Sequence, residues 1–280
     1  MSESYVERPP RPELSGAVRT VWVQRTGAEA YVQRHLPTGG VELHVPIGGR
    51  PRLLGPLTAP RLEVIAPRTT VVGVRFWPGT PPPLPAALDD LVDQRVDLTD
   101  LWGRAALRLA EPRAPERVLA AVQRHVLDGL RRSGAADPLV RAAVRALMPW
   151  HPVGIEPLAE HLGISVSQLR RRCLHAVGVG PKVLQRTLRF QGFLALAQAG
   201  FAASGRPGAD GVSTLAADVG YADQAHLGRE CLRLSGLTPR QLLGTASLDR
   251  CACGHDHSAS YRPFLRGVRD SFKTGARRGR

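Results

Sequence analysis

Residues 215–243 read LAADVGYADQAHLGRECLRLSGLTPRQLL, and this stretch decides the fold of the C-terminal half. An apolar pattern at helical spacing ends at Val219, Gly220 turns the chain, and a second such pattern begins at Leu227. Asp223 precedes the second pattern, where its carboxylate can accept free backbone N–H groups and meet the positive end of the helix dipole. The stretch therefore predicts a helix-turn-helix.

The first turn of the second helix carries polar residues on its exposed face. Gln224, His226 and Arg229 are a mixture that suits base edges and phosphates. We therefore expect duplex DNA as a partner.

Comparison of the chain with itself reveals a repeat. Leu158 to Ile164 matches Leu215 to Tyr221 at an offset of 57 residues, and Leu169 to Leu184 matches Leu227 to Leu242 at an offset of 58. The chain thus carries two helix-turn-helix units, each followed by a helix that starts with proline. Two recognition helices about 34 Å apart can enter successive major grooves on one face of the duplex. A duplicated helical hairpin without a ligand is the alternative.

This repeat, and GYADQAHLGRECLRLSGLTPRQL at its end, closely resembles the AraC/XylS family of bacterial transcription regulators. The resemblance covers residues 151–247 and is most specific in the second unit, where Asp223, Gln224, Arg229 and the Gly236-x-Thr238-Pro239 pattern stand as in that family. It implies a bi-lobed, all-helical DNA-binding domain behind an N-terminal effector or dimerisation domain, commonly a small β-barrel.

The resemblance also implies which side chains contact DNA. Those expected to read bases are Val166, Ser167, Arg170 and Arg171 in the first unit, and Gln224, Ala225, Gly228 and Arg229 in the second. Those expected at phosphates are Arg172, Lys182, Arg186 and Arg189. The family usually has phenylalanine where Cys173 and Cys231 stand, and we expect both to be buried small apolar thiols.

Composition indicates a globular protein with a polyanionic partner. The 280 residues are 43% hydrophobic and 22% charged, with a formal net charge of +14. The excess grows along the chain, from +2 over residues 1–110 to +5 over residues 248–280. No apolar run approaches the length of about 20 residues that a spanning helix needs, and the N-terminus has no export signal, so we expect a cytoplasmic location and reduced cysteines.

Residues 1–110 contain short alternating or β-branched runs separated by Gly and Pro clusters, which predict a small antiparallel sheet or barrel. The expected strands are Val18–Gln24, Ala30–His35, Val41–Val45, Leu62–Ala66 and Val71–Phe76. Two short helices are expected after Leu84, the first from the pattern of Leu88, Leu91 and Val92 and the second from that of Leu98, Leu101, Trp102, Ala105 and Leu109.

Residues 111–150 predict a helical connector with one helix at 115–132 and one at 137–150, the second capped by Asp137. An apolar stripe from Val118 to Leu130 on the first helix either packs on its own domain or pairs with a second subunit.

Two groups of residues could bind a metal ion. In the β-rich part, His35, Glu42 and His44 could be brought together inside a barrel. In the tail the candidate zinc ligands are Cys251, Cys253, His255 and His257, whose i+2 spacing differs from that of structural zinc sites. Ordinary polar residues and a basic disordered tail are the alternatives, and no cofactor is required by the DNA-binding function.

The sequence thus predicts an α+β multidomain chain: a β-rich sensor or dimerisation domain (1–110), the connector (111–150), a double helix-turn-helix domain (151–247) and a basic tail (248–280). Its expected function is sequence-specific transcription regulation without enzymatic activity. Expected partners are double-stranded DNA, an unknown small-molecule effector, a second copy of the chain and RNA polymerase, but no membrane. The alternatives are a metal-dependent enzyme or metal sensor, and a dimerising repressor without a small-molecule signal.

Overall fold

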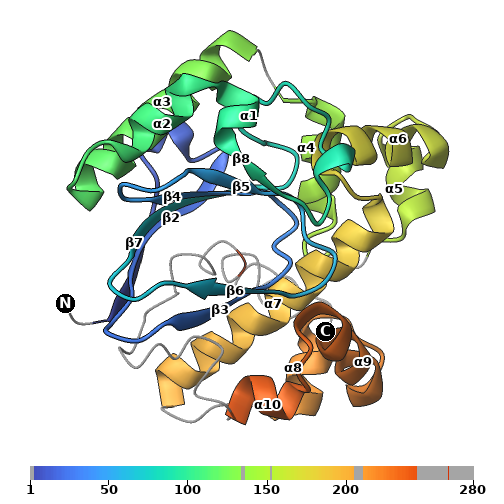
Figure 1. The fold of residues 1–280 in the computed structure, drawn as a ribbon. Helices are drawn as coiled ribbons and strands as arrows, with labels where there is room; N and C mark the ends of the chain where they lie inside the picture. The colour runs from blue at the N-terminus through green and yellow to red at the C-terminus, as the bar shows by residue number, and fades with distance from the viewer. Residues whose placement is uncertain (1–2, 134–135, 152, 205–210, 245–263, 265–280) are drawn as a thin grey trace.

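The computed structural model describes residues 3–133, 136–151, 153–204, 211–244 and residue 264. A β-rich part, covered on one side by helices, comes first in the chain, and an all-helical part follows it (Figure 1). The fold class predicted from the sequence, an N-terminal antiparallel sheet domain before a helical domain with helix-turn-helix units, is confirmed.

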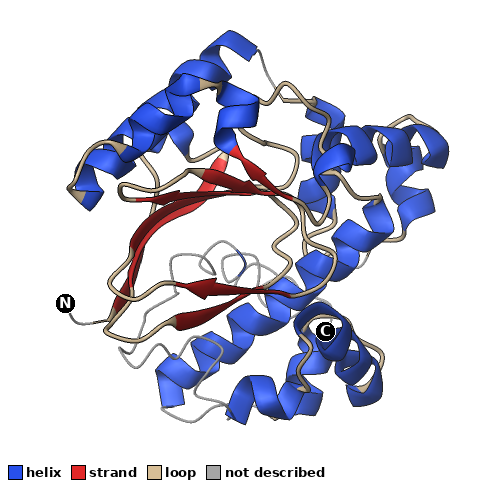
Figure 2. Ribbon diagram, viewed as in Figure 1, coloured by secondary structure: helices blue, strands red, loops and turns tan. Residues whose placement is uncertain are grey.

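The β-rich part contains a six-stranded and a two-stranded antiparallel sheet. The large sheet has the strand order β1-β2-β7-β4-β5-β8, and the small sheet pairs β3 with β6. The strands are β1 (Ser4–Arg8), β2 (Val18–Arg25), β3 (Tyr31–His35), β4 (Glu42–Pro46), β5 (Arg52–Leu54), β6 (Arg61–Ile65), β7 (Thr70–Phe76) and β8 (Arg95–Asp97). The two sheets lie one above the other, with the helices of this part on the far side of the large sheet (Figures 1 and 2).

Alternation along the strands gives the large sheet one apolar face and one mixed face, on which polar side chains lie beside the apolar Trp22 and Val71. On β4, Leu43 and Val45 join the main core, whereas Glu42 and His44 project to the opposite side. On β7, the valines at 72 and 74 face the same core, and Arg75 projects with Glu42. Helices cover the apolar face, and the mixed face looks toward the small sheet (Figure 1).

Three helices seal the apolar face. They are α1 (Leu98–Trp102), α2 (Arg104–Ala110) and α3 (Pro115–Ser133), and 3-10 turns occur at Pro12–Leu14 and Asp89–Leu91. Val118, Val122 and Val126 of α3 are fully buried in the core of the β-rich part. The apolar stripe of α3 thus packs on its own domain. The next helix, α4 (Pro138–Ala146), packs instead with the first helix-turn-helix unit, so the two helices of the predicted connector belong to different cores.

The helical part forms two lobes around one long helix. Its helices are α5 (Ile155–His161), α6 (Val166–Val177), α7 (Pro181–Ser204), α8 (Val212–Asp218), α9 (Gln224–Ser235) and α10 (Pro239–Gly244). Leu184 and Leu188 of α7 lie in the core of the first lobe, while Phe190 and Phe193 lie in that of the second. Since α7 contributes to both cores, it holds the lobes in a fixed relation.

The helical part is packed on the β-rich part through buried polar contacts. The guanidinium of Arg19 on β2 donates to Oε1 of Gln191 on α7 over 3.0 Å, and Nε2 of Gln191 donates to the carbonyl of Pro37 over 2.8 Å. Both side chains are almost completely buried. Phe264, also buried, lies under the same guanidinium at 4.7 Å from ring centroid to Cζ.

The sequence-based prediction missed three strands and overestimated one helix. β1 lies in the Pro-rich leader, and β5 and β8 have only three residues each, too few to show alternation. The helix expected around Leu88 to Val92 is wrong: a 3-10 turn precedes β8 there, since Leu88 and Leu91 are anchored in the core without a continuous helical stripe.

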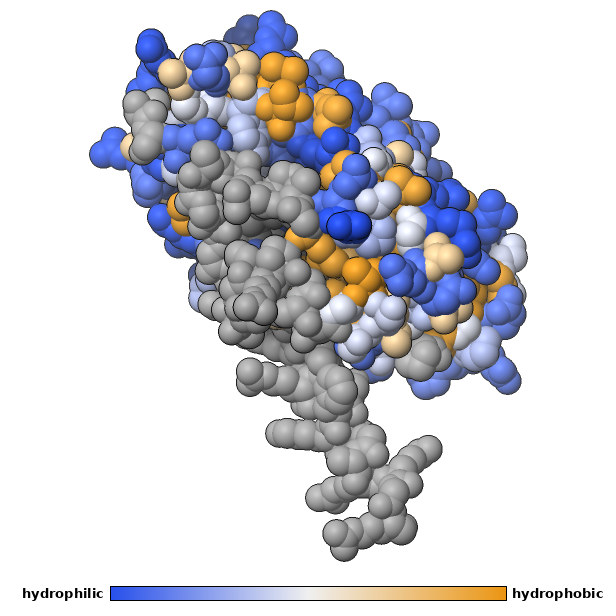
Figure 3. All heavy atoms as spheres, turned by 90° about the horizontal axis from the view of Figure 1, so that it is seen from below, coloured by the Kyte–Doolittle hydropathy of each residue, from blue (hydrophilic) through white to orange (hydrophobic). Residues whose placement is uncertain are grey.

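Among the described residues no helix is long and apolar enough to cross a membrane. Seen from below the view of Figure 1, the described surface is mostly hydrophilic, with apolar side chains in small groups (Figure 3). On the outer face of the small sheet Val32, Leu62 and Val64 are exposed.

A glycine on β7 allows an indole to lie flat across the sheet. A Cβ at Gly73 would lie only 1.9 Å from Cε2 of Trp22 on β2. We expect Gly73→Ala to displace Trp22 and to lower the free energy of unfolding by about 1–3 kcal/mol, because a buried ring has no room to move. Gly16→Ala is the control, since no atom lies within 4 Å of its Cβ position. Equal thermal unfolding midpoints for the two variants would contradict this packing.

Candidate nucleic-acid interface and polar cluster

The first helix-turn-helix consists of α5 and α6. Gly163 makes the turn with φ +67°, and Ser165 caps α6 through a capping box. Ser165 Oγ accepts from the Gln168 backbone N–H at 3.1 Å, and Gln168 Oε1 accepts from the Ser165 N–H at 2.8 Å. Gly178 ends the helix in the left-handed conformation at φ +85°. Local sequence therefore fixes both ends of the first recognition helix.

The second unit, α8 and α9, repeats this construction. Gly220 makes the turn, and Asp223 caps α9 by accepting from the His226 N–H at 2.6 Å, as the sequence predicted. Gly236 ends α9 at φ +72°. Cys231 on α9 and Cys173 on α6 are both fully buried, and burial raises the pKa of Cys173 to about 11 and of Cys231 to about 12. Both are packing residues, as expected.

Seven of the eight side chains expected to read bases are exposed, and Gly228 is half-buried. Of these residues, Arg170, Arg171 and Arg229 have no ion pair within 4 Å among the residues that the structure describes. Gln224 Oε1 accepts a hydrogen bond from Ser213 Oγ at 3.3 Å, which orients its amide at the start of α9. Each recognition helix thus offers an accessible polar first half.

The residues expected at phosphates are placed differently from one another. Lys182 is exposed, whereas Arg172 pairs with Asp137, the cap of α4, at 2.6 Å. Arg186 on α7 makes a two-pronged ion pair with Glu230 on α9, with Nε to Oε2 at 2.8 Å. Arg189 lies over the ring of Tyr221 at 5.7 Å.

The pairing of Glu230 with Arg186 was not predicted from the sequence. The position of Glu230 directly before the buried Cys231 could have indicated that its carboxylate is buried and needs a partner.

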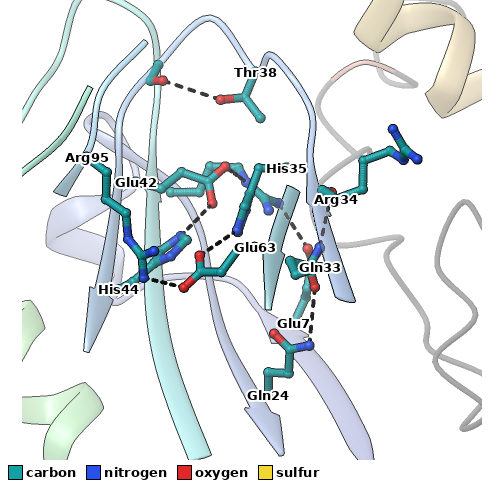
Figure 4. Close-up of polar contacts among 12 residues, drawn as sticks. Glu7, Gln24, Gln33, Arg34, His35, Thr38, Glu42, His44, Glu63 and Arg95 are labelled. Atoms are coloured by element: carbon teal, nitrogen blue, oxygen red, sulfur yellow. Dashed lines mark hydrogen bonds and ion pairs between the residues drawn. The ribbon is translucent and has the colours of Figure 1, made fainter. Parts of the chain in front are cut away.

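A second polar cluster lies between the two sheets (Figure 4). His35 Nε2 on β3 is 3.0 Å from Glu63 Oε2 on β6, and the two histidine rings, His35 and His44, are 5.0 Å apart between centroids. Arg95 on β8 hydrogen-bonds to Glu63. One ligand atom each from His35, His44 and Glu63 lies within 4.8 Å of the others.

The sequence-based grouping of His35, Glu42 and His44 is therefore corrected in its third member. Glu42 does lie beside His44, at 3.4 Å from Nε2, but its other oxygen accepts from Arg75 Nε at 2.7 Å. Glu63 replaces Glu42 in the close group. Pairing of β6 with β3 sets Glu63 opposite Gln33, on the same face of the small sheet as His35. Cys251, Cys253, His255 and His257 lie outside the described residues.

Charges around the cluster set its protonation. Although burial opposes ionisation, the charge of Arg75 and the hydrogen bond with His44 hold the pKa of Glu42 well below its usual range. Burial likewise opposes ionisation of Glu63, but the hydrogen bond with His35 and the charge of Arg95 hold its pKa at about 2. Burial lowers the pKa of His44, more than its hydrogen bond with Glu42 raises it. The carboxylates are thus ionised and His44 is neutral at neutral pH.

Two capped recognition helices with exposed polar and basic residues, repeated in tandem, define a DNA-binding protein. Residues 158–244 match the family model described as a helix-turn-helix domain, and residues 6–97 match that of a domain of unknown function, DUF6597. Residues 158–244 therefore form a helix-turn-helix DNA-binding domain.

Solved structures of ToxT align with most of the chain at low sequence identity. ToxT from Vibrio cholerae O395 aligns with a TM-score of 0.45 and 9% identity, over 87% of this chain and 98% of that one. ToxT from the same source bound to (E)-4-(8-methylnaphthalen-1-yl)but-3-enoic acid gives 0.41 and 8%, over 87% and 98%. Wild-type ToxT from Vibrio cholerae strain SCE256 with a bound unsaturated fatty acid gives 0.40 and 10%, over 89% and 96%. No curated protein sequence matches the chain.

The ion pair between Arg186 and Glu230 joins α7 to the second recognition helix. Glu230→Gln should lower the free energy of unfolding by about 1–2 kcal/mol at neutral pH, because a mostly buried guanidinium contact loses its charged partner. The pKa of Glu230 is lowered, against the effect of burial, by Arg186, so its stabilising effect is present above its ordinary pKa and is lost as the pH falls through the folded value.

Urea unfolding of wild type and variant from pH 7 downward tests this. The difference should be largest at neutral pH and should shrink in acid, while the exposed Glu156→Gln on α5 should change little at any pH. A difference that stays constant down to pH 3 would contradict a role for the charge.

Proposed function

We propose that this regulator binds its operator with α6 and α9 in successive major grooves on one face of the duplex. The observation that carries the proposal is the duplicated construction of the two units, each with a polar cap, a left-handed glycine at the helix end and an accessible basic first half. The base-reading residues are Val166, Ser167, Arg170, Arg171, Gln224, Ala225, Gly228 and Arg229.

The rigid helix between the lobes supports a fixed spacing of the two half-sites. α7 has 24 residues, which corresponds to about 36 Å at 1.5 Å per residue, and its side chains enter both lobe cores. A single subunit would then cover about one and a half turns of DNA without a flexible linker. The half-site spacing is accordingly a property of the fold.

Phosphate contacts divide into two groups under this proposal. Lys182 is exposed and can contact the DNA backbone directly. Arg172, Arg186 and Arg189 instead contact neighbouring protein side chains, and they contribute positive charge near the DNA. Affinity should fall steeply with salt, because each neutralised phosphate releases counterions.

The β-rich part is proposed to control the two lobes. Arg34 on β3 donates to the carbonyl of Ser235, in the last turn of α9, over 3.0 Å. At the end of α6, a Cβ on Gly178 would lie 2.8 Å from the carbonyl oxygen of Leu88. Both recognition helices thus end against the β-rich part, so a change there would reach both.

An effector, a second copy of the chain and RNA polymerase are proposed partners besides DNA, and the cytoplasm is the proposed location. A repressor that dimerises without an effector is the competing possibility, and a ligand-induced shift of the thermal unfolding midpoint would distinguish them.

Selection of bound DNA from a random pool tests the proposed mode. We expect a motif of two short blocks about one helical turn apart. A single block, or no enrichment, would contradict it.

Arginine variants test the reading of individual bases. Arg171→Ala and Arg229→Ala should each cost about 1–3 kcal/mol of binding to the selected operator, and each should relax preference within a different block. Arg104→Ala, an exposed arginine on α2 of the β-rich part, removes the same charge and should change neither block. If Arg229→Ala weakens binding to operator and random DNA equally, that residue contacts phosphate and not a base.

A further inference from the structure

Three side chains from three strands meet in the space between the sheets. His35 comes from β3, His44 from β4 and Glu63 from β6, and Figure 4 shows them pointing toward one another. Their ligand atoms lie within 4.8 Å of one another, and no more than about 15% of any of the three side chains is exposed. Two ligands of one ion at about 2.1 Å each are at most about 4.2 Å apart, so a small contraction completes the geometry.

The donor set selects a class of metal. Two imidazole nitrogens and one carboxylate oxygen suit Zn²⁺, Fe²⁺, Co²⁺ or Ni²⁺, whereas Mg²⁺ and Ca²⁺ prefer oxygen ligands alone. Three protein ligands also leave at least one position for water or for a donor atom of a small molecule. The arrangement is that of an open site.

Arginine side chains hold the carboxylates beside the site in place. Arg75 donates to Glu42 and to Glu7, and Arg95 bonds to Glu63. The carboxylate of Glu63 is therefore already positioned next to both histidine rings.

We propose that His35, His44 and Glu63 bind one divalent transition-metal ion and that the ion regulates DNA binding through β3. Glu42 supports the site from outside by holding His44, and Arg95 orients Glu63. The regulatory half of the inference rests on the proposed DNA-binding mode, whereas the metal site does not.

Alternation on β3 connects the site to the second lobe. His35 faces inward to the ligands, and its neighbour Arg34 faces the other way and binds the Ser235 carbonyl of α9. An ion bound by His35, His44 and Glu63 would fix the small sheet, which contains β3, to β4 of the large sheet. Loading the site therefore changes how firmly Arg34 holds the end of the recognition helix.

Metal binding is tested first without DNA. The full chain, free of any histidine tag and carrying alanine at positions 251, 253, 255 and 257, is equilibrated with Zn²⁺ or Co²⁺, and bound metal is counted by mass spectrometry. We expect one equivalent. Glu63→Gln should lose it, while Glu42→Gln should keep one equivalent at saturation, because its amide oxygen still accepts a hydrogen bond from the His44 ring.

No bound metal in this chain would overturn the proposal, and so would loss in Glu42→Gln together with retention in Glu63→Gln. X-ray absorption of the cobalt-loaded protein, without ligand substitutions, gives a readout that does not depend on how a variant folds. Two imidazole nitrogens with oxygen support the site, and the absence of imidazole scattering contradicts it.

The regulatory half is tested with the operator obtained by selection. Zn²⁺ should change operator affinity on the order of 5-fold or more, a typical size for coupling between two sites. Arg34→Gln should keep one equivalent of metal and lose most of this change. A metal effect of full size in Arg34→Gln would overturn the route through β3. Failure of the operator selection itself would leave the metal count unchanged, so the two proposals fail separately.

Discussion

A buried side chain in the middle of α7, Gln191, fastens the DNA-binding part to the sheets. It accepts a hydrogen bond from Arg19 and donates one to the carbonyl of Pro37, so one amide is bonded on both sides to the β-rich part. Buried polar groups are costly to leave unpaired. Because α7 contributes to both lobe cores, these two bonds hold both recognition helices in a set relation to the sheets.

A second contact, from Arg34 to α9, explains how the β-rich part can act on a recognition helix. The small sheet has an inner face with ligating groups and an outer face that includes Arg34, whose guanidinium reaches the end of α9. A ligand bound between the sheets would therefore contact one face of β3, and the end of α9 is bonded to the other face of the same strand. A regulator needs two arrangements with different affinities for its ligands, and the hydrogen bond from Arg34 to Ser235 is a contact that such arrangements could make or break.

Much of the helical part could be predicted from sequence, because its information is local. The caps at Asp137 and Asp223, the glycines after each recognition helix and the buried cysteines follow from spacing alone. Strands with clear alternation were also found. Contacts between residues far apart in the chain could not be predicted from the sequence. Examples are Glu63 beside His35, and Arg34 beside Ser235, which are 201 residues apart. Alternation places Glu63 on a face of β6, but only the fold tells which histidines lie opposite.

Hydroxyl-radical footprinting on the selected operator shows whether both recognition helices enter the major groove. We expect two protected stretches on one face of the duplex, about 10 base pairs apart, since α7 joins two lobes that each insert one helix in a major groove. Protection of a single stretch, or of two stretches on opposite faces, would contradict it.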